Sequence, residues 1–459
     1  MATLRCISPI DGSVVAERET LSAEAAREAV ARAKHAQAAW AARPLRERVD
    51  LVLAGVAAVG AMNDEIVPEL ARQMGRPVRY GGEFGGFEER AVHMGRIAAE
   101  ALADIEVSDD EGFRRFIRRV PHGVVLVIAP WNYPYMTAIN TVAPALIAGN
   151  AVLLKHATQT LLVGERMARA FHSAGVPEEV FQNVFLDHAT TSTLISERAF
   201  GFVNFTGSVA GGRAIETAAA GTFTALGLEL GGKDPGYVME DADLDAAVDT
   251  LMDAAMYNTG QCCCGIERIY VAEPLFEVFV EKAVALVKGY RLGDPLDPET
   301  TLGPMAQARF ADTVRAQVAE AVAMGATAHI ETFAEDDGGA YLTPQILTGV
   351  THEMRVMRDE SFGPVVGIMK VSSDDEAIAL MNDSEFGLTA SLWTSDIARA
   401  ERVGDRIETG TVFMNRADYL DPGLCWTGCK NTGRGGGLSV IGYHNLTRPK
   451  SYHLKKVTT

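Results

Sequence analysis

The sequence predicts an α/β fold: a parallel sheet covered by helices on both faces, followed by a second α/β unit. Two observations predict it. From residue 124 onwards, short runs of Val, Ile and Leu alternate with amphipathic stretches of about a dozen residues, which is the pattern of buried strands joined by crossover helices. The chain of 459 residues is also too long for one hydrophobic core and should divide into two or three domains.

The first α/β series has the strand–helix alternation of Rossmann-like dinucleotide-binding folds. Its strands are expected at Val124–Ala129, Ala151–Lys155, Phe181–Leu186, Phe202–Thr206 and Thr224–Glu229. The helices between them are expected at Thr137–Ala148, Thr160–Ala174 and Ser208–Ala220. Two further helices, Ser22–Trp40 and Leu45–Met62, precede this series.

A second α/β series follows. Its helices are expected at Asp243–Asn258, Leu275–Gly289, Ala306–Met324 and Asp374–Asn382. Its strands are expected at Glu267–Val271, Val365–Val371, Leu388–Trp393 and Thr411–Asn415. Two β-prone segments, Phe113–Val120 and Leu446–Val457, fit neither sheet. Each is a lone strand with no evident partner, so its edge must be covered or paired.

Composition excludes several classes of function. A formal net charge of −18 argues against nucleic-acid or anionic-membrane partners, which need a positive surface. No segment approaches the roughly 18–20 apolar residues of a membrane span, and no secretory signal is evident. Six cysteines, three of them contiguous, do not form a disulfide framework, so we expect a cytoplasmic protein. No metal site is expected, because Cys425 and Cys429 lack a second pair or a histidine cluster nearby.

The candidate chemistry is concentrated in two short segments. Residues 258–264 read Asn-Thr-Gly-Gln-Cys-Cys-Cys, and residues 228–233 read Leu-Glu-Leu-Gly-Gly-Lys. A thiolate and a carboxylate in an apolar setting predict covalent catalysis assisted by a general base. Taken alone, Cys263 would more often be an inert buried thiol and Glu229 a solvated carboxylate. Adjacent residues point in different directions, so only one of the three cysteines can face a substrate.

Together with further motifs in the same order, at 128–134, 205–212 and 360–364, these segments resemble the aldehyde dehydrogenase superfamily over nearly the whole chain. The resemblance implies that Cys263 is the nucleophile, Glu229 the base and Asn132 the side-chain donor to the oxyanion. It also implies non-acylating oxidation of an aldehyde to the carboxylic acid, through a thiohemiacetal and a thioester, with reduction of NAD(P)⁺.

The resemblance further implies a domain organisation and a set of partners. An NAD(P)-binding domain would comprise residues 1–102 and 122–231, and a catalytic domain residues 232–431. Segments 103–121 and 432–459 would form the small β element that pairs subunits. The partners expected are therefore a small-molecule aldehyde and further copies of the chain, in a homodimer or homotetramer.

The cofactor residues implied by the resemblance are Pro130, Trp131, Lys155, Thr158, Gly207, Ser208, Gly212, Glu360 and Phe362. Many NAD-preferring members have a glutamate where this chain has Thr158. A carboxylate there accepts hydrogen bonds from the ribose 2′-hydroxyl and repels a 2′-phosphate. Threonine removes that repulsion, so NADP⁺ should be tolerated, or even preferred.

The substrate pocket implied by the resemblance has three aromatic walls, Tyr133, Tyr257 and Trp426. Members that oxidise succinic semialdehyde carry an arginine at the position of Tyr257, so its absence counts against that substrate. Three polar residues lie just before Trp426 and could either contact a polar substrate tail or form a solvated loop: Arg416, Asp418 and Asp421.

Two other functions are compatible with the same fold. The first is a coenzyme-A-acylating aldehyde dehydrogenase, although such relatives typically lack the base at Glu229. The second is a catalytically retired structural or binding protein, which the intact set Cys263, Glu229, Asn132 and Glu360 argues against.

Overall fold

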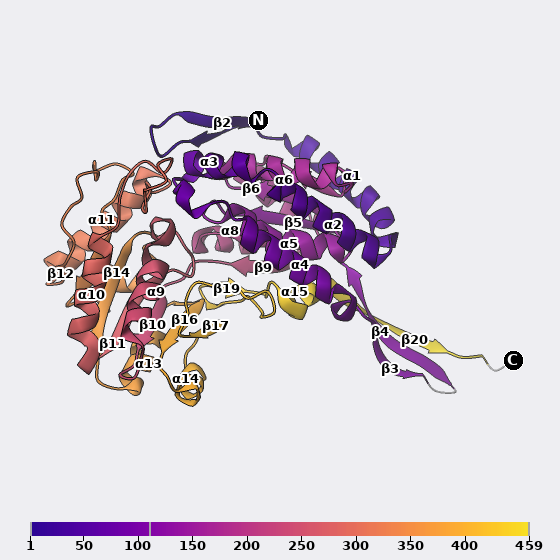
Figure 1. Ribbon diagram of the computed structural model, residues 1–459. Helices are drawn as coiled ribbons and strands as arrows, with labels where there is room; N and C mark the ends of the chain where they lie inside the picture. Colours follow the sequence, from indigo (N-terminus) through magenta and orange to yellow (C-terminus); the bar gives the residue numbers. More distant parts are fainter. Residues whose placement is uncertain (1, 110–111, 458–459) are drawn as a thin grey trace.

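The computed structural model describes residues 2–109 and 112–457. Within them the chain forms two large sheets, and it passes from the strands of the first to those of the second through four residues (Figure 1). Strand β9 (Ala225–Glu229) belongs to the first sheet and β10 (Asp234–Val238) to the second. Residues 230–233 are therefore the direct link between the two sheets.

The first sheet has the strand order β19-β9-β8-β5-β6-β7, with all neighbours parallel except the antiparallel edge strand β19. Every residue of β5 and β6 is buried, as expected for strands covered on both faces. The five predicted strands are confirmed, although β7 is shorter than expected because the chain leaves the sheet after Asn183. Besides β9, the strands are β5 (Val124–Ala129), β6 (Ala151–His156), β7 (Phe181–Asn183), β8 (Phe202–Thr206) and β19 (Gly433–Arg434).

The predicted crossover helices of this sheet are confirmed as α5 (Pro134–Ile147), α6 (Leu161–Ser173) and α8 (Val209–Ala219). Helix α7 (His188–Ser196) was not predicted, because its threonines and serines have low helix propensity. It is stabilised at its start by Asp187, whose side chain accepts a hydrogen bond from the Thr190 N–H at 2.7 Å.

Four N-terminal helices lie against the first sheet and its helices: α1 (Ala23–Ala42), α2 (Leu45–Gly60), α3 (Asn63–Met74) and α4 (Phe84–Ala101). The first two confirm the prediction, and the other two were not predicted. In α4, a Cβ atom on Gly86 would lie 2.4 Å from the Met136 sulfur. The glycine therefore lets α4 pack closely against α5.

The second sheet has the order β12-β13-β14-β11-β10-β16-β17 and is parallel except at β12. The central strand β10 was not predicted, because its sequence Asp234-Pro235-Gly236 contains residues that disfavour strands. The other strands are β11 (Ile266–Ala272), β12 (Thr327–Ala328), β13 (Gln345–Thr348), β14 (Val365–Val371), β16 (Thr389–Trp393) and β17 (Thr411–Met414).

The helices around this second sheet confirm the predicted positions to within three residues and add two short ones, α12 and α14. They are α9 (Leu244–Met256), α10 (Phe276–Lys288), α11 (Ala308–Ala323), α12 (Arg355–Arg358), α13 (Asp374–Asn382) and α14 (Ile397–Gly404).

The two unassigned β-prone segments pair with each other. Strand β4 (Phe113–Pro121) lies antiparallel to β20 (Thr447–Lys455) along the full length of both, and β3 (Ile105–Asp109) adds a third strand. This sheet projects from the body of the molecule (Figure 1). The segments expected at 103–121 and 432–459 include residues 110–111 and 458–459, which lie outside the described residues.

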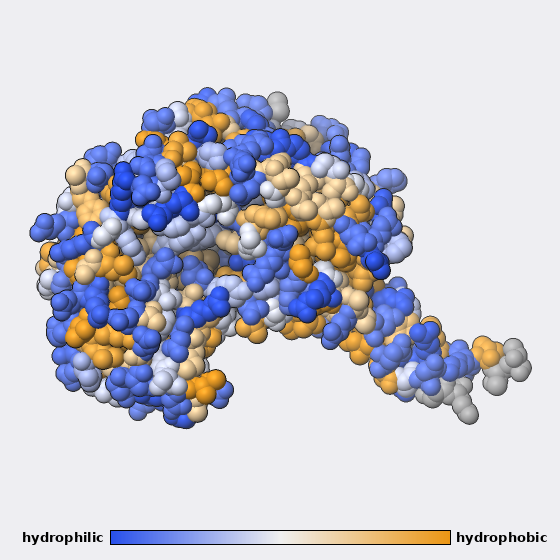
Figure 2. Space-filling model, in the orientation of Figure 1, coloured by the Kyte–Doolittle hydropathy of each residue, from blue (hydrophilic) through white to orange (hydrophobic). Residues whose placement is uncertain are grey.

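The remaining elements are short: β1 (Thr3–Ile7), β2 (Val14–Glu19), β15 (Phe386–Gly387), β18 (Cys429–Lys430) and α15 (Ser439–Asn445). Among residues 2–109 and 112–457, no single helix is long and apolar enough to cross a membrane. Only α2 and α3 taken together, with a bend of 68° between them, have the length and composition. Figure 2 shows that one face of the molecule is hollowed between its two larger parts.

Candidate active site

A cavity of about 320 Å³ collects most of the predicted catalytic and substrate residues. Its lining includes Cys263, Glu229 and the three expected aromatic walls, Tyr133, Tyr257 and Trp426. The two neighbouring cysteines line it as well, so the expectation that only one of the three faces the cavity is wrong. These residues come from the end of β9, the start of α5, the loop after α9 and the segment after β17. The structure therefore brings together residues that lie up to 293 positions apart, from 133 to 426.

The loop that carries the cysteines has an unusual backbone. After α9, Asn258 and Thr259 both have positive φ, 54° and 56°, which is costly for a β-branched residue such as threonine. The Thr259 hydroxyl donates to the Gly303 carbonyl at 3.0 Å, and the Gln261 side-chain carbonyl accepts from the Ala306 N–H at 2.8 Å. These contacts hold the strained loop and so fix the cysteines that follow.

The three adjacent cysteines are electrostatically different. The Cys262 and Cys264 thiols on either side favour the anion of Cys263 and lower its pKa to about 6. In contrast, the pKa of Cys262 is raised to about 12 and that of Cys264 is raised well above its ordinary value. Of the three, Cys263 is therefore the thiol whose surroundings favour the thiolate, which is the reactive form in nucleophilic catalysis.

Glu229 is the last residue of β9, and its carboxyl group faces the same cavity. Burial raises its pKa to about 7, against smaller opposing effects of the Thr206 hydroxyl and the Arg90 guanidinium. The Thr206 hydroxyl donates to Glu229 Oε2 at 3.4 Å. A carboxylate with a pKa near neutrality is suited to act as a general base, because it both accepts and releases a proton at that pH.

Asn132 lies behind the cavity rather than in its lining. The side chain is buried, and its Nδ2 donates to the Gln261 carbonyl at 3.2 Å, two residues before Cys263. Its backbone carbonyl accepts hydrogen bonds from Arg76 and, at 3.3 Å, from Asn258 Nδ2. The amide is therefore held against the cysteine loop from both sides.

A buried ion pair supports this arrangement, and the sequence analysis missed it. Arg76 and Glu83 form a 2.8 Å salt bridge, and the exposed fractions of their side chains are 3% and 1%. Arg76 also lies over the Tyr133 ring, with its guanidinium carbon 4.7 Å from the centroid. Arg76 joins elements far apart in the chain, so no local pattern marks it.

Lys155 and Thr158 follow at the carboxyl end of β6. Lys155 is buried, and among the described residues no carboxylate lies within ion-pair distance of it. Burial lowers its pKa. Thr158 is exposed. A buried cation without a protein partner, at this edge of the sheet, fits a group that accepts hydrogen bonds, such as a ribose hydroxyl.

The predicted phosphate turn lies between β8 and α8. Ser208 caps the helix: its hydroxyl accepts a hydrogen bond from the Gly211 N–H at 3.2 Å. A Cβ atom on Gly207 would lie 2.8 Å from the Phe205 ring, and one on Gly212 would lie 2.6 Å from Leu230. Gly212 therefore lets α8 pack against the link at 230–233, Gly207 leaves room for the Phe205 ring, and the helix N-terminus suits an anion.

Glu360 and Phe362 come from the loop before β14 and contact the same link. Glu360 Oε1 accepts a hydrogen bond from the Gly232 N–H at 3.0 Å, and burial raises its pKa to about 8. Phe362 has a positive φ of 49°, and its ring meets the Trp131 ring edge-on, 5.6 Å between centroids. Pro130 precedes Trp131 at the end of β5 and is buried.

A second buried ion pair, also missed from the sequence, holds this loop in place. Lys233 Nζ lies 2.5 Å from Glu267 Oε2 and donates to the Ser361 hydroxyl at 3.0 Å. Glu267 in turn accepts the backbone N–H groups of Ser361 and Phe362, each at 2.8 Å. The link at 230–233, strand β11 and the Glu360 loop are thus joined by one network of ionic contacts and hydrogen bonds.

Of the three polar residues whose role stayed open, only Asp418 lines the cavity. Arg416 stacks on the Tyr419 ring, 3.6 Å from its centroid, and Asp421 accepts the Gly423 N–H at 2.8 Å. The cavity lining also includes Arg90, which was not predicted; its NH1 donates to the Met136 carbonyl at 3.0 Å.

Comparison with known proteins agrees with this geometry. The sequence pattern of the aldehyde dehydrogenase family matches residues 2–452. The chain is 32% identical over 445 residues to a succinate-semialdehyde dehydrogenase [NADP(+)] of Deinococcus radiodurans, covering 97% of this chain and 93% of that protein. It is 32% identical to a betaine aldehyde dehydrogenase of Rhizobium etli over 457 residues, covering 98% and 93%.

A solved structure gives the same result. The fold superposes on a succinate-semialdehyde dehydrogenase from Burkholderia pseudomallei with a TM-score of 0.94 at 30% identity, covering 99% of this chain and 94% of that one. Sequence and structure therefore agree along almost the whole length. The chain belongs to the aldehyde dehydrogenase family and is an oxidoreductase that converts aldehydes to carboxylic acids with NAD(P)⁺ as the oxidant.

Proposed function

We propose that Cys263 is the nucleophile, Glu229 the general base and Asn132 the side-chain donor to the oxyanion. One observation carries this assignment: a thiol with a lowered pKa and a carboxyl with a raised pKa line the same cavity. Such opposed shifts are typical of a paired nucleophile and base. The residues that would form the substrate walls are Tyr133, Tyr257 and Trp426.

The first half of the reaction uses Cys263 and Asn132. The thiolate attacks the aldehyde carbon, and the carbonyl oxygen becomes an oxyanion. Asn132 Nδ2 has a second hydrogen besides the one given to Gln261, and the Cys263 backbone N–H finds no acceptor among the described residues. Both donors are available to stabilise that charge. The nicotinamide, when bound, takes the hydride that leaves the thiohemiacetal carbon, which converts it into a thioester.

The second half uses Glu229. Its carboxylate removes a proton from water, the hydroxide adds to the thioester carbon, and the carboxylic acid leaves as the Cys263 thiolate is restored. The presence of this base supports hydrolysis rather than transfer to coenzyme A. The two relatives named above are aldehyde dehydrogenases. Their names therefore argue against both alternatives, a coenzyme-A-acylating enzyme and a structural protein.

The test is chemical. Protein mixed with an aldehyde and NAD(P)⁺, without coenzyme A, should yield the acid and the reduced cofactor in equal amounts. Acid-quenched protein should carry the acyl group on the peptide that contains residues 258–264. An acyl group on any other peptide, or turnover that requires coenzyme A, would contradict the assignment.

We propose that the cofactor is held by residues at the carboxyl edge of the first sheet and by the Glu360 loop. The buried Lys155 and the exposed Thr158 would meet the adenine ribose. The N-terminus of α8, with Gly207, Ser208 and Gly212, would meet the phosphates. Glu360 would bind the nicotinamide ribose, with Phe362, Trp131 and Pro130 beside the ring. Because Thr158 carries no negative charge, both NAD⁺ and NADP⁺ should bind.

The cavity lining favours aldehydes with a neutral or cationic tail. It contains four carboxyl groups, those of Glu89, Glu229, Asp253 and Asp418, and one guanidinium, that of Arg90. Arg90 already interacts with Glu83 and Glu229, so its charge is largely balanced. Burial raises the pKa values of Glu229, Asp253 and Asp418, so the aromatic walls, with carboxyls that can ionise beside them, suit a neutral or cationic tail. A carboxylate tail would meet repulsion, in line with the missing arginine at Tyr257.

Three aldehydes of one chain length separate these cases: butanal, succinic semialdehyde and 4-trimethylammoniobutanal. We expect kcat/KM to be lowest for succinic semialdehyde. The Asp253→Asn variant, which removes a carboxyl from the wall, should lower kcat/KM for the cationic aldehyde and leave that for butanal unchanged. A wild-type preference for succinic semialdehyde would refute this part of the proposal.

We also propose the division into a cofactor domain (1–102 and 122–231), a catalytic domain (232–431) and subunit-pairing segments (103–121 and 432–459). The projecting β3–β4–β20 sheet supports the last of these, since Ile105, Val107 and Leu454 are exposed on it. A homodimer or homotetramer should follow, and light scattering would measure it. Six free cysteines fit a cytoplasmic location.

A further inference from the structure

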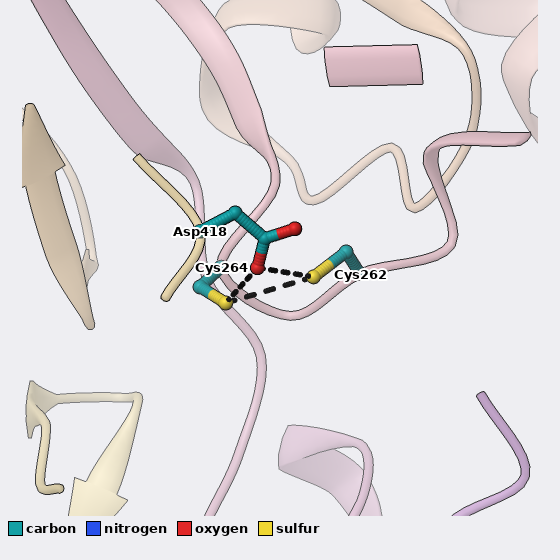
Figure 3. A group of neighbouring side chains, drawn as sticks. All are labelled: Cys262, Cys264 and Asp418. Atoms are coloured by element: carbon teal, nitrogen blue, oxygen red, sulfur yellow. Dashed lines mark hydrogen bonds between the residues drawn. The ribbon is translucent and has the colours of Figure 1, made fainter. Parts of the chain in front are cut away.

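Two cysteines that the proposed reaction does not use converge on one carboxylate beside the nucleophile. Cys264 Sγ lies 2.9 Å and Cys262 Sγ lies 3.3 Å from Asp418 Oδ1, and the two sulfurs are 3.6 Å apart (Figure 3). Cys262 and Cys264 flank Cys263 in the loop after α9, whereas Asp418 comes from the segment after β17. The cluster is thus assembled by the fold.

The backbone at Asp418 supports a built cluster rather than a chance approach. Its φ is 49°, in the left-handed region that residues other than glycine seldom occupy. Such a conformation persists only where surrounding contacts impose it. The two neighbours first considered as potential tail contacts, Arg416 and Asp421, point to other partners, so Asp418 alone is turned toward the sulfurs.

The spacing is close to that of a tetrahedral metal site and slightly tighter, so a cation would need to move the three ligand atoms apart by less than about 1 Å. Zinc binds thiolate sulfur at about 2.3 Å and carboxylate oxygen at about 2.1 Å, so a tetrahedron separates two sulfurs by about 3.8 Å and sulfur from oxygen by about 3.6 Å. The observed separations are smaller by 0.2–0.7 Å when set against these values. We propose that Cys262, Cys264 and Asp418 form an inhibitory binding site for a thiophilic divalent cation, Zn²⁺, beside the catalytic cysteine.

The charges explain why the site binds a cation when one is present. Cysteine and aspartate bind a metal ion as thiolate and carboxylate, so binding displaces up to three protons, two from sulfur and one from oxygen. Two thiolates, one carboxylate and the dication leave a net charge of −1, and the buried guanidinium of Arg90, although shared with Glu83 and Glu229, lies close enough to Cys264 to interact with it.

The position explains inhibition. All three ligands line the same cavity as Cys263, so the cation enters by the aldehyde's route. With three protein ligands, the fourth coordination position is left for water or another donor from the cavity. A bound cation would occupy space next to the nucleophile. It would also withdraw electron density from the Cys263 thiolate and make it less nucleophilic. The predicted inhibition rests on the proposed role of Cys263 as the nucleophile. The predicted binding of the cation does not.

Binding is tested directly with Co²⁺ and Zn²⁺ on protein reduced by a non-chelating phosphine and freed of metal. One Co²⁺ per chain should bind and produce the sulfur-to-cobalt charge-transfer absorption of a two-thiolate site. Zn²⁺ should displace it. Affinity should rise with pH, because protons are released. Cys262→Ser, Cys264→Ser and Asp418→Asn should each weaken binding by at least about 100-fold.

Two matched variants complete the experiment. Cys429→Ser, a cysteine outside the cavity, should bind Co²⁺ as wild type does. Cys263→Ser should retain the absorption, which shows that binding does not depend on the nucleophile. The proposal fails if wild type shows no stoichiometric absorption, or if the absorption is lost in Cys263→Ser and kept in Cys262→Ser and Cys264→Ser. In that case the thiols only donate hydrogen bonds to Asp418.

Discussion

Arg76 and Glu83 form a salt bridge with almost no exposed surface, and Arg76 extends from it to the backbone carbonyl of Asn132. Glu83 Oε2 also accepts the Met136 N–H at 2.7 Å, at the start of α5. The pair therefore fixes the turn between β5 and α5 from which the Asn132 amide reaches the cysteine loop. In the proposed mechanism, the pair positions the Asn132 amide and does not contact the substrate.

The first prediction concerns this pair. Arg76→Met or Glu83→Met alone should lower the free energy of unfolding by about 3–5 kcal/mol, because each leaves a buried charge unpaired. The double variant should regain most of that stability, since no charge remains. Its kcat should stay at least about tenfold below wild type, because the Asn132 carbonyl has lost the Arg76 donor and keeps only the longer bond from Asn258. Chemical denaturation and steady-state rates measure the two effects, and a double variant with wild-type kcat would show that the pair is only structural.

The second prediction identifies the nucleophile. Cys263→Ala should lower kcat/KM by at least about 10³-fold, which is about 4 kcal/mol of transition-state stabilisation. In metal-free buffer, Cys262→Ala and Cys264→Ala should each retain most of the activity at alkaline pH, because the nucleophile stays in place. Loss of a neighbouring thiol that lowers the pKa of Cys263 should shift the onset of activity to higher pH. Alanine at each of the three positions is a matched set. If Cys262→Ala is the inactive variant, the nucleophile is the preceding residue.

The third prediction separates the two halves of the reaction. Glu229→Gln should transfer one hydride per active site in a burst and then stall, because the thioester is no longer hydrolysed. In the wild type, the deacylation rate should rise as pH increases through about 7, where Glu229 loses its proton. Absorbance of the reduced cofactor and mass spectrometry of the acyl-enzyme measure both. Steady turnover by the variant without an acyl adduct would remove Glu229 from this role.

The fourth prediction follows from the sign of the same pKa shift. The folded protein holds the Glu229 proton up to about pH 7, whereas an unfolded glutamate releases it near 4.3. Between those values the native state binds more protons, so this carboxyl reduces stability as pH rises. Glu229→Gln removes the effect. Its Tm relative to wild type should therefore increase from pH 5 to pH 8, and a constant difference would mean that the carboxyl is not buried in this way.

The fifth prediction concerns cofactor choice. Thr158→Glu places a carboxylate beside any 2′-phosphate, and at an effective dielectric near 20 two charges about 4 Å apart repel by roughly 4 kcal/mol before screening. Because Thr158 is exposed, a quarter of that is a reasonable expectation, which corresponds to about a fivefold loss. The ratio of kcat/KM for NADP⁺ to that for NAD⁺ should fall accordingly. Wild-type protein that already rejects NADP⁺ would place the discrimination at another residue.

The sequence predicted the parts of the fold whose signals are local. Apolar runs such as 124–129 and 151–155 became β5 and β6 with almost unchanged limits. Strand β10 was missed because it begins with Asp-Pro-Gly, residues that disfavour strands. It forms a strand because it pairs with β11 on one side and β16 on the other. Likewise, α7 is stabilised by a cap and by packing rather than by propensity. Non-local context overrides local preference in both cases.

The same distinction holds for the site. Cys263, Glu229, Tyr133, Tyr257 and Trp426 lie in motifs and do line one cavity. Arg76, Glu267 and Arg90 carry no motif. Although Glu83 is only seven positions from Arg76, the contacts that tie these residues to the site are distant in the chain; the Arg76–Asn258 contact, for example, spans 182 positions. The cluster of Cys262, Cys264 and Asp418 joins residues 154 or more positions apart. Such contacts become visible only when the fold brings their partners together.

The link at 230–233 has a mechanical consequence. Four extended residues span at most about 14 Å, so the two sheets can rotate about this segment but have no slack to move apart. Glu229 lies at one end of the link, and Gly232 within it bonds to Glu360. Any rotation of one sheet against the other about this link would therefore take place beside Glu229, the proposed base. Inserting one residue into this link would lengthen it. We expect such a variant to lose catalytic activity while it still folds.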